Sequence, residues 1–146
     1  MHVLVAYDES DQAERALRHA LERYPEATVT AAHVTDPREW IAESDEEGSQ
    51  FVEGAYDRAA DTAEQTLEEA AAIATEYDRS LRTESLVGGP ARELVAFANE
   101  HDVDHIVLGS HGRRGVSRFL RGSVSEAVAK RSPVSVTMIR KPDEAD

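Results

Sequence analysis

The sequence predicts an α/β domain of three layers, in which helices cover both faces of a mostly parallel sheet of five strands. Two observations predict it: apolar, β-branched runs alternate five times with segments of helical periodicity, and most connections between them are short. Parallel strands joined by right-handed helical crossovers satisfy such a pattern. No internal repeat or second domain interrupts it, so residues 1–141 are expected to form one domain, followed by a polar tail over residues 142–146.

The first strand and helix are marked by a change of period near residue 8. Residues 2–7 are apolar and end in the acidic turn Asp8-Glu9-Ser10-Asp11. Asp11 and Glu14 have the spacing of a capping box, which predicts that the helix begins there. The apolar side chains of this helix recur on one face, and Pro25 ends it. The residues of that face are Ala13, Ala16, Leu17, Ala20 and Leu21.

The second strand is predicted over Thr28 to Val34 and the third over Leu81 to Val87. Between them, an acidic stretch that runs to Gly48 predicts a mobile loop. A long helix with a thin, alanine-rich apolar stripe follows from about Phe51. Gly88-Gly89-Pro90 closes the third strand, and its proline lies near the first position of the next helix.

The last part of the chain carries two more strands around a glycine-rich connection. Asp104 to Leu108 and Val134 to Ile139 are the predicted strands, and a helix is predicted from about Ser123 to Arg131. With five strands, the flavodoxin-like and the adenine-nucleotide α-hydrolase-like arrangements both satisfy the pattern. Each has a switch point beside the first strand, where ligands bind.

Composition excludes several classes of function. The absence of cysteine excludes disulfides, thiolate catalysis and zinc sites with sulfur ligands. The histidines are scattered, so no metal site is expected. No apolar run reaches the length of a membrane span and no signal peptide is recognised, which predicts a cytoplasmic protein without a membrane partner.

The chain is strongly acidic, with 29 Asp and Glu residues, 16 Lys and Arg residues and a net charge of −13. This balance argues against general binding of nucleic acid, which needs a basic face. It predicts a halophilic protein, because salt screens the repulsion within an acidic surface. The alternative is an ordinary acidic surface that keeps the protein soluble.

The segment from Gly109 to Ser125 is expected to bind phosphate groups. It follows the fourth strand, and its connection of about a dozen residues exceeds the usual length of a βα loop. It holds arginines and no acid, and its glycines allow main-chain N–H groups to approach an anion. Gly122-Ser123 would present amides and a hydroxyl at the helix start. The alternative is that the glycines only form turns and the arginines pair with surface carboxylates.

Two other phosphate-binding motifs are absent from the sequence. There is no G-x-x-x-x-G-K-[ST], and the first βα turn contains no glycine, so neither the P-loop nor the dinucleotide fingerprint is present. The phosphates are therefore expected at the fourth strand.

The spacing G-x-x-G, nine residues, then G-S occurs at Gly109, Gly112, Gly122 and Ser123. It resembles the nucleotide-binding motif of the universal stress protein family, and the first strand with its acidic turn, His33-Val34, Gly89-Pro90 and Ser132-Pro133-Val134 are also similar to that family. The resemblance implies ATP binding on a five-stranded parallel sheet of order 3-2-1-4-5, the adenine-nucleotide α-hydrolase-like arrangement, which is Rossmann-like.

The resemblance also implies which residues contact the nucleotide. Val34 would meet the adenine edge through its main chain, and Asp8 would face the ribose or a nucleotide-bound Mg²⁺, with a helix cap as its alternative role. Tyr7 either stacks near the base or fills the sheet surface. His111 either donates to a phosphate, serves as a general acid, or lies on the surface without a function. The remaining expected ligand-binding residues are Gly109, Ser110, Gly112, Gly122, Ser123, Val124 and Ser125.

The expected function is that of an ATP-binding stress-response regulator, in which bound ATP orders the glycine loop and changes a surface for an unidentified protein partner. No residue is nominated as catalytic, so at most slow ATP hydrolysis or self-phosphorylation is expected. The first alternative is a dimeric interaction module that works without nucleotide. The second is an adenylyl-transferring enzyme of related fold, whose Ser-Gly-Gly-x-Asp-Ser type of first turn is absent here.

The last strand, Val134 to Ile139, is expected at the edge of the sheet, where the topology of the resembled family places it. Uncovered strand edges invite pairing with another chain. A homodimer joined through this strand is therefore predicted, and an edge shielded by the tail is the alternative.

Overall fold

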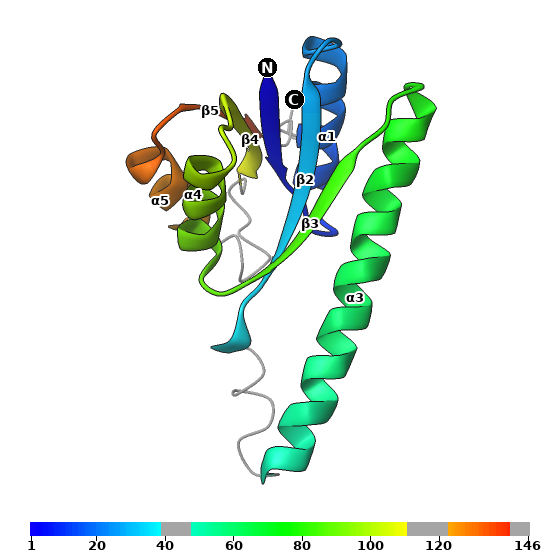
Figure 1. The fold of residues 1–146 in the computed structure, drawn as a ribbon, viewed down its shortest axis with the longest axis vertical. Coiled ribbons are helices and arrows are strands. Elements are labelled where there is room, and N and C mark those ends of the chain that lie inside the picture. Colours follow the sequence, from blue (N-terminus) through cyan, green and yellow to red (C-terminus); the bar gives the residue numbers. More distant parts are fainter. Residues whose placement is uncertain (39–47, 111–122, 141–146) are drawn as a thin grey trace, which may run out of the picture.

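The structure, a computed structural model, describes residues 1–38, 48–110 and 123–140. The strands are β1 (His2–Ala6), β2 (Thr28–Thr35), β3 (Arg82–Val87), β4 (His105–Ser110) and β5 (Ser135–Arg140). The helices are α1 (Asp11–Arg23), α3 (Gly48–Glu76), α4 (Pro90–Glu100) and α5 (Ser123–Arg131). The five strands form one parallel sheet in the order β3-β2-β1-β4-β5 (Figure 1). The predicted fold class and strand order are both confirmed.

The order of the strands creates a switch point beside β1. The chain builds outward from β1 to β3 and then returns to add β4 and β5 on the other side. Helices α1 and α3 cover one face of the sheet, and α4 and α5 cover the other (Figure 1). Because the helices after β1 and β4 leave on opposite faces, a crevice opens at the carboxyl ends of these two strands.

The sheet has a hydrophobic core on each face, and alternate side chains of β1 point into one core or the other. Val3 and Val5 face α1 and α3, whereas Leu4 faces α4 and α5. All three are fully buried, as expected for the central strand of a parallel sheet that is covered on both faces. The apolar face predicted for α1 is confirmed, and its buried residues are Ala13, Ala16, Leu17, Ala20 and Leu21.

The cap of α1 differs from the prediction by one residue. Ser10 is the N-cap, and its Oγ accepts a hydrogen bond from the Ala13 N–H at 3.1 Å. The predicted capping box that starts at Asp11 is therefore wrong, because the hydroxyl one residue earlier already satisfies the first turn. Asp11 is instead the first residue of the helix, where its negative charge interacts favourably with the helix dipole.

Helix α3 extends well beyond the sheet (Figure 1). Its 29 residues span about 43 Å at 1.5 Å per residue, about twice the length of a six-residue strand. Among its described side chains, the buried ones are Ala63, Thr66, Leu67, Ala70, Ile73 and Ala74. The carboxyl-terminal half therefore packs on the sheet. The predicted start near Phe51 falls three residues inside the helix.

Strand β4 ends two residues later than predicted. Gly109 and Ser110 continue the ladder with β5, where they pair with Ile139 and Arg140. The glycine after the apolar run predicts a loop, but pairing with a strand distant in sequence keeps it in the sheet. Gly109 is therefore part of the strand and not the beginning of a loop.

Three predicted segments lie outside the described residues: most of the acidic loop, the glycine-rich loop over 111–122, and the tail after residue 140. Within the ranges that the structure describes, no helix is both long enough and apolar enough to cross a membrane.

Candidate functional site

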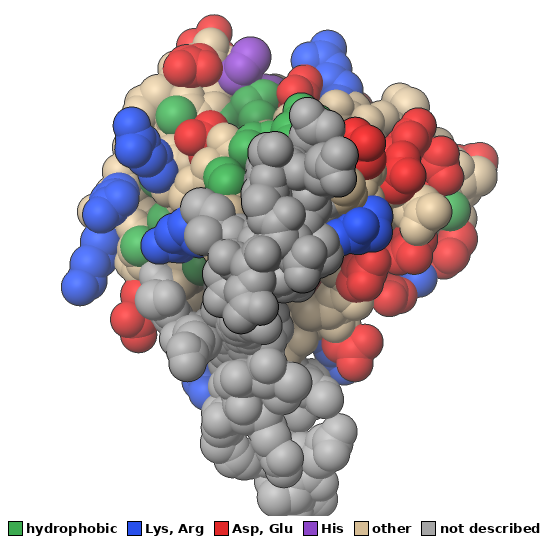
Figure 2. Space-filling view, turned by 90° about the horizontal axis from the view of Figure 1, so that it is seen from below, with side chains coloured by type: hydrophobic (Ala, Val, Ile, Leu, Met, Phe, Trp, Pro, Cys, Tyr) green, Lys and Arg blue, Asp and Glu red, His purple; other side chains and the backbone are tan. Residues whose placement is uncertain are grey.

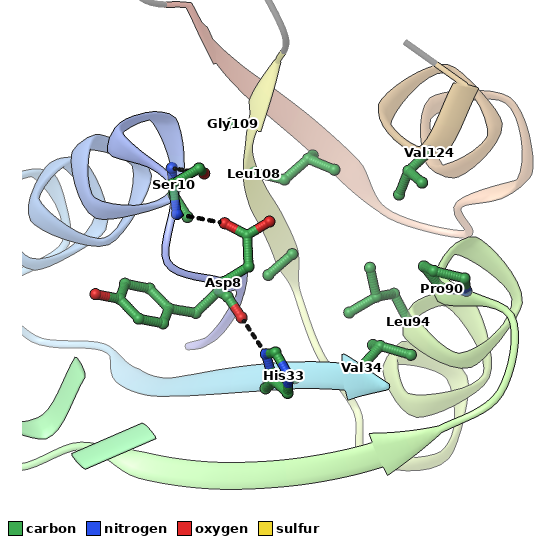
Figure 3. A pocket seen from close by; sticks show the side chains of 13 residues that line it. Asp8, Ser10, His33, Val34, Pro90, Leu94, Leu108, Gly109 and Val124 are labelled. Carbon is green, nitrogen blue, oxygen red and sulfur yellow. Dashed lines mark hydrogen bonds between the residues drawn. The ribbon is translucent and has the colours of Figure 1, made fainter. Parts of the chain in front are cut away.

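A pocket opens at the carboxyl ends of β1, β2 and β4, where the strand order reverses (Figure 3). The space between its walls, including the part open to solvent, is about 460 Å³. The amino-terminal end of α1 borders one side, and α4 and α5 border another (Figure 3). The lining residues are Ala6, Tyr7, Asp8, Ser10, Ala13, Ala32, His33, Val34, Pro90, Leu94, Leu108, Gly109 and Val124.

Ala6 and Ala32 form a low apolar surface on the sheet side of the pocket. They are register partners on β1 and β2, and their methyl groups leave room above the strands. Val34, Leu94 and Leu108 border the same space, and each of them is more than nine-tenths buried (Figure 3). A flat apolar ring fits such a surface better than a charged group does.

The main chain of Val34 presents polar groups beyond the end of the β1–β2 ladder. That ladder ends at the pair Ala6 and Ala32, and the Tyr7 N–H donates to the Ala32 carbonyl at 2.8 Å just past it. Because main-chain groups alternate in direction along a strand, those of Val34 point to the same side as those of Ala32. The Gly88 N–H donates to the Thr35 carbonyl at 2.9 Å on the opposite side, as this alternation requires. Val34 therefore offers an N–H donor and a carbonyl acceptor at the pocket.

Asp8 supplies a negative charge to the pocket. Its Oδ1 accepts a hydrogen bond from the Ser10 N–H at 2.8 Å, which orients the carboxylate (Figure 3). No other hydrogen bond to this carboxylate comes from the residues that the structure describes. A carboxylate accepts hydrogen bonds from hydroxyl groups or binds a cation, whereas it repels a bare phosphate. Asp8 thus has a local role at the turn and still has capacity for a ligand.

His33 contacts the turn that carries Asp8. Its Nδ1 lies 3.1 Å from the Tyr7 carbonyl oxygen (Figure 3). Because a carbonyl oxygen can only accept, Nδ1 carries the proton, and Nε2 is the unprotonated nitrogen of the neutral ring. Sequence reasoning placed His33 in a strand but missed this contact, which joins residues 26 positions apart.

The side chain of Tyr7 fills the core. It is 5% exposed and belongs to the core that faces α1 and α3. Burial, followed by the negative charges of Glu69 and Glu14, raises the pKa of Tyr7 to about 12. Tyr7 thus belongs to this core and also to the lining of the pocket.

Gly109 lines the pocket, and its lack of a side chain has a packing reason. A Cβ at this position would lie 2.5 Å from Cβ of Gln12 and 2.7 Å from its main-chain carbon. The first turn of α1 therefore passes directly against β4. Ser110, the next residue, ends β4 and is not part of the described pocket lining.

Helix α5 begins beside the pocket. Ser123 is its first residue, and Val124 lines the pocket. The N–H groups of a first helical turn lack partners within the helix and carry partial positive charge. Ser125, in the same turn, is 5% exposed. The other expected ligand-binding residues of this region, His111, Gly112 and Gly122, lie outside the described residues.

Among residues 1–38, 48–110 and 123–140, no group of three or more His, Cys, Asp or Glu residues could hold a metal ion. His101 and His105 are four positions apart, which is the spacing of one helix face, but they do not lie in the same helix. His101 caps the end of α4, and His105 begins β4.

Sequence reasoning missed several lining residues because it assigned them to local structure. Ser10, Ala13, Pro90 and Leu94 were expected only at helix starts or on apolar helix faces. What they share is their position, since each lies at the N-cap or in the first two turns of a helix that follows a strand. Such residues meet at the carboxyl edge of a parallel sheet.

Comparison with known proteins identifies relatives whose similarity extends over all five strands of the sheet. The model of the universal stress protein family matches residues 1–140. Universal stress protein MJ0531 of Methanocaldococcus jannaschii is 30% identical over 142 residues, which cover 96% of this chain and 82% of that protein.

Solved structures are similar as well. The structure of MJ0577, described as a structure-based assignment of the biochemical function of a hypothetical protein, has a TM-score of 0.80 at 28% identity and covers 98% of this chain and 97% of that one. The universal stress protein from Archaeoglobus fulgidus in complex with dAMP has a TM-score of 0.68 at 30% identity, with 95% and 97% covered.

Proposed function

This chain belongs to the universal stress protein family, and we propose that it binds an adenine nucleotide, with ATP as the preferred ligand, in the pocket beside β1 and β4. The observation that carries the proposal is the combination of an apolar surface, the main-chain groups of Val34 and the oriented carboxylate of Asp8 in one pocket. The complex of a relative with dAMP supports the class of ligand.

The adenine base is assigned to the apolar end of the pocket. Its ring would lie over Ala6 and Ala32 and against Leu94, while its edge would meet the main chain of Val34. The exocyclic amine of adenine donates and the adjacent ring nitrogen accepts, so one carbonyl and one N–H satisfy both. Burial of the ring supplies affinity, and these two groups orient it.

The ribose is assigned to Asp8. A carboxylate that already accepts one hydrogen bond from the Ser10 N–H can accept others from ribose hydroxyl groups. The same charge would keep the phosphates away from the turn and direct them toward β4 and α5.

The phosphates are assigned to the end of β4, the glycine-rich loop and the start of α5. The amides of the first turn of α5 favour an anion, and the family motif adds Gly109, Gly112, Gly122 and Ser123. Ser110, His111, Val124 and Ser125 complete this proposed set. Mg²⁺ would enter with the nucleotide as a counter-ion of its phosphates and would not need ligands from a dedicated protein site.

We infer that the protein acts as a cytoplasmic, nucleotide-dependent regulator of the stress response. Binding is the primary activity, and slow ATP hydrolysis or self-phosphorylation is at most secondary, because phosphoryl transfer also needs an in-line acceptor and a placed water, for which the sequence nominates no residue. Nucleotide occupancy would change the surface around the glycine-rich loop, which a regulatory protein would contact. A homodimer through β5 is part of the proposal.

Calorimetric titration with Mg-ATP, Mg-GTP and AMP tests the proposal. ATP is expected to bind more tightly than GTP, and ATP at 100 times its dissociation constant should stabilise the fold by about 2.7 kcal/mol. Asp8→Asn should weaken binding, whereas Asp11→Asn, the neighbouring acid outside the pocket lining, should not. Absence of binding and of stabilisation would favour the interaction module that works without nucleotide.

A further inference from the structure

We propose that His33 and Thr66 are positioning residues for the nucleotide: they hold the turn of residues 7–10 from the side of α3, so that Asp8 is presented to the pocket on the other side. The inference rests on the nucleotide site proposed above. It concerns two side chains, on β2 and α3, that act on the pocket through the turn; His33 also lines the pocket, whereas Thr66 does not.

The turn between β1 and α1 has two sides. Asp8 lines the pocket together with Leu94 and Val124, which belong to the side of α4 and α5. Tyr7 sends its ring into the opposite core, toward α1 and α3. His33 lies two residues after Ala31, which packs in that same core, so its side chain starts on the α3 side of the sheet. Thr66 therefore lies on the side of the turn away from the pocket, whereas His33, which also lines the pocket, reaches the turn from the α3 side of the sheet.

His33 holds the residue before Asp8. Its Nδ1–H donates to the Tyr7 carbonyl over 3.1 Å. That carbonyl belongs to the same planar peptide unit as the Asp8 N–H. An imidazole attached to a strand of the sheet is a rigid donor, so the bond restricts the orientation in which the chain enters Asp8. Without it, this carbonyl would need another donor at the end of β1.

Thr66 holds the residue after Asp8. Its side chain is completely buried, and its Oγ1 donates to Oε2 of Glu9 at 3.2 Å. A threonine hydroxyl within a helix commonly bonds to the carbonyl of the preceding turn, as Thr75 does with Ala71 at 3.1 Å. Thr66 is directed away from its own helix and toward the turn. It joins α3 to the nucleotide site across 57 positions of sequence.

Three hydrogen bonds thus act on consecutive residues of the turn. His33 fixes Tyr7, the Ser10 N–H fixes the Asp8 carboxylate, and Thr66 fixes Glu9. Binding is favoured when the protein does not have to order a group as the ligand arrives. The two supports should therefore increase affinity for the part of the nucleotide that Asp8 contacts, which is the ribose.

Calorimetric titration of His33 variants with two nucleotides tests the inference. His33→Leu removes the donor, and the dissociation constant for ATP should rise about threefold to tenfold. The dissociation constant for 2′,3′-dideoxy-ATP, which lacks the ribose hydroxyls, should stay within about twofold of its wild-type value. His33→Asn places an amide N–H near the position of Nδ1 and should restore most of the affinity for ATP.

Thr66→Val provides an independent test because it removes the hydroxyl and keeps the shape. The dissociation constant for ATP should rise about threefold, again without a change for the dideoxy nucleotide. Thr66→Ser should retain affinity. Thr75→Val is the matched control on the same helix, since it removes a hydroxyl whose partner is in its own helix.

The outcomes separate this inference from the proposed function. A wild-type protein that binds no nucleotide overturns the proposed function. A wild-type protein that binds ATP, with variants that bind it unchanged or lose equal affinity for both nucleotides, overturns the positioning role alone. Thermal melting establishes that each variant is folded, and if His33→Leu does not fold, Thr66→Val decides.

Discussion

Gly109 on β4 and Gln12 on α1 are packed so closely that no side chain fits between them. A Cβ on Gly109 would lie 2.5 Å from Cβ of Gln12 and 2.8 Å from its carbonyl oxygen. The contacts with the carbonyl oxygen and with the main-chain carbon, at 2.7 Å, involve the main chain of the helix, which cannot rotate away as a flexible side chain can. The first glycine of the expected phosphate motif therefore has a structural role in joining α1 to the sheet.

Gly109→Ala should destabilise the protein by about 1 to 3 kcal/mol, because α1 must shift to accommodate the methyl group. Urea unfolding measures the effect. Gly89→Ala is the matched control: a Cβ there would lie 4.0 Å from Cβ of Arg92, and Gly89 has a φ of −71° that alanine adopts without strain. The control should remain within about 1 kcal/mol of the wild type. A Gly109→Ala protein as stable as this control would contradict the packing role.

Local sequence patterns predicted most of the fold because apolar residues recur with different spacings in the strands and in the helices. The buried face of α1 and the bounds of α5 follow from such patterns. The end of β4 could not be predicted in this way, since Gly109 and Ser110 stay in the sheet only through pairing with Ile139 and Arg140 of a distant strand.

The pocket was only partly predictable for the same reason. Asp8 follows β1 and Val34 is the next-to-last residue of β2, and their position at the carboxyl edge of the sheet marks them as candidates. The contacts of His33 with Tyr7 and of Thr66 with Glu9 join residues 26 and 57 positions apart. No local period encodes such pairs, so only the assembled sheet and helices bring them together.

Salt should stabilise this protein. Figure 2 shows acidic side chains gathered on the flank where α3 lies, and the exposed acids of that helix include Asp57, Asp61, Glu64 and Glu68. Their three successive i, i+3 and i, i+4 pairs each cost roughly 0.2 to 0.5 kcal/mol, or about 1 kcal/mol together. Raising the salt concentration from 0.1 M to 1 M shortens the screening length from about 10 Å to about 3 Å. The free energy of unfolding, measured with urea at both concentrations, should therefore rise by at least about 1 kcal/mol.

Asp61→Asn tests the source of the salt effect, because Asp61 takes part in two of those three pairs. The variant should be more stable than the wild type at 0.1 M salt and should gain less from added salt. A wild-type stability that does not depend on salt would remove the halophilic interpretation of the acidic surface.

Acid should destabilise the fold through His105. Burial, followed by the charge of His19, holds the pKa of His105 below its ordinary value of 6.5. The folded protein then binds fewer protons than the unfolded chain as the pH falls below about 6.5, so the free energy of unfolding decreases in that range. The stability contributed by the neutral ring is fully present above the unfolded pKa and is lost as the pH falls toward the folded one.

His105→Gln removes this titration and leaves an amide that can bond to Thr137, the present partner of the histidine Nε2 at 2.7 Å. Urea unfolding at pH 7.5 and pH 5.5 should show a smaller loss of stability for the variant than for the wild type. Equal losses for the two proteins would assign the acid sensitivity to other groups.

The two edges of the sheet differ in how they resist pairing with another chain. The edge strand β3 carries the exposed charges of Arg82 and Glu84, which oppose edge-to-edge association. The edge strand β5 carries one charge, at its last residue Arg140, and exposes 45% of Met138. This contrast favours β5 over β3 as the surface of the proposed homodimer.

Met138→Lys should therefore convert the protein from dimer to monomer, because a desolvated ammonium group at the centre of the interface would lack a partner. Sedimentation equilibrium at the working salt concentration measures the mass. Val87→Lys is the matched control, since Val87 is 50% exposed at the end of β3 on the opposite edge, and it should leave the dimer intact. A wild-type protein with the mass of one chain would refute the dimer. Dimers that persist in Met138→Lys and dissociate in Val87→Lys would move the interface to β3.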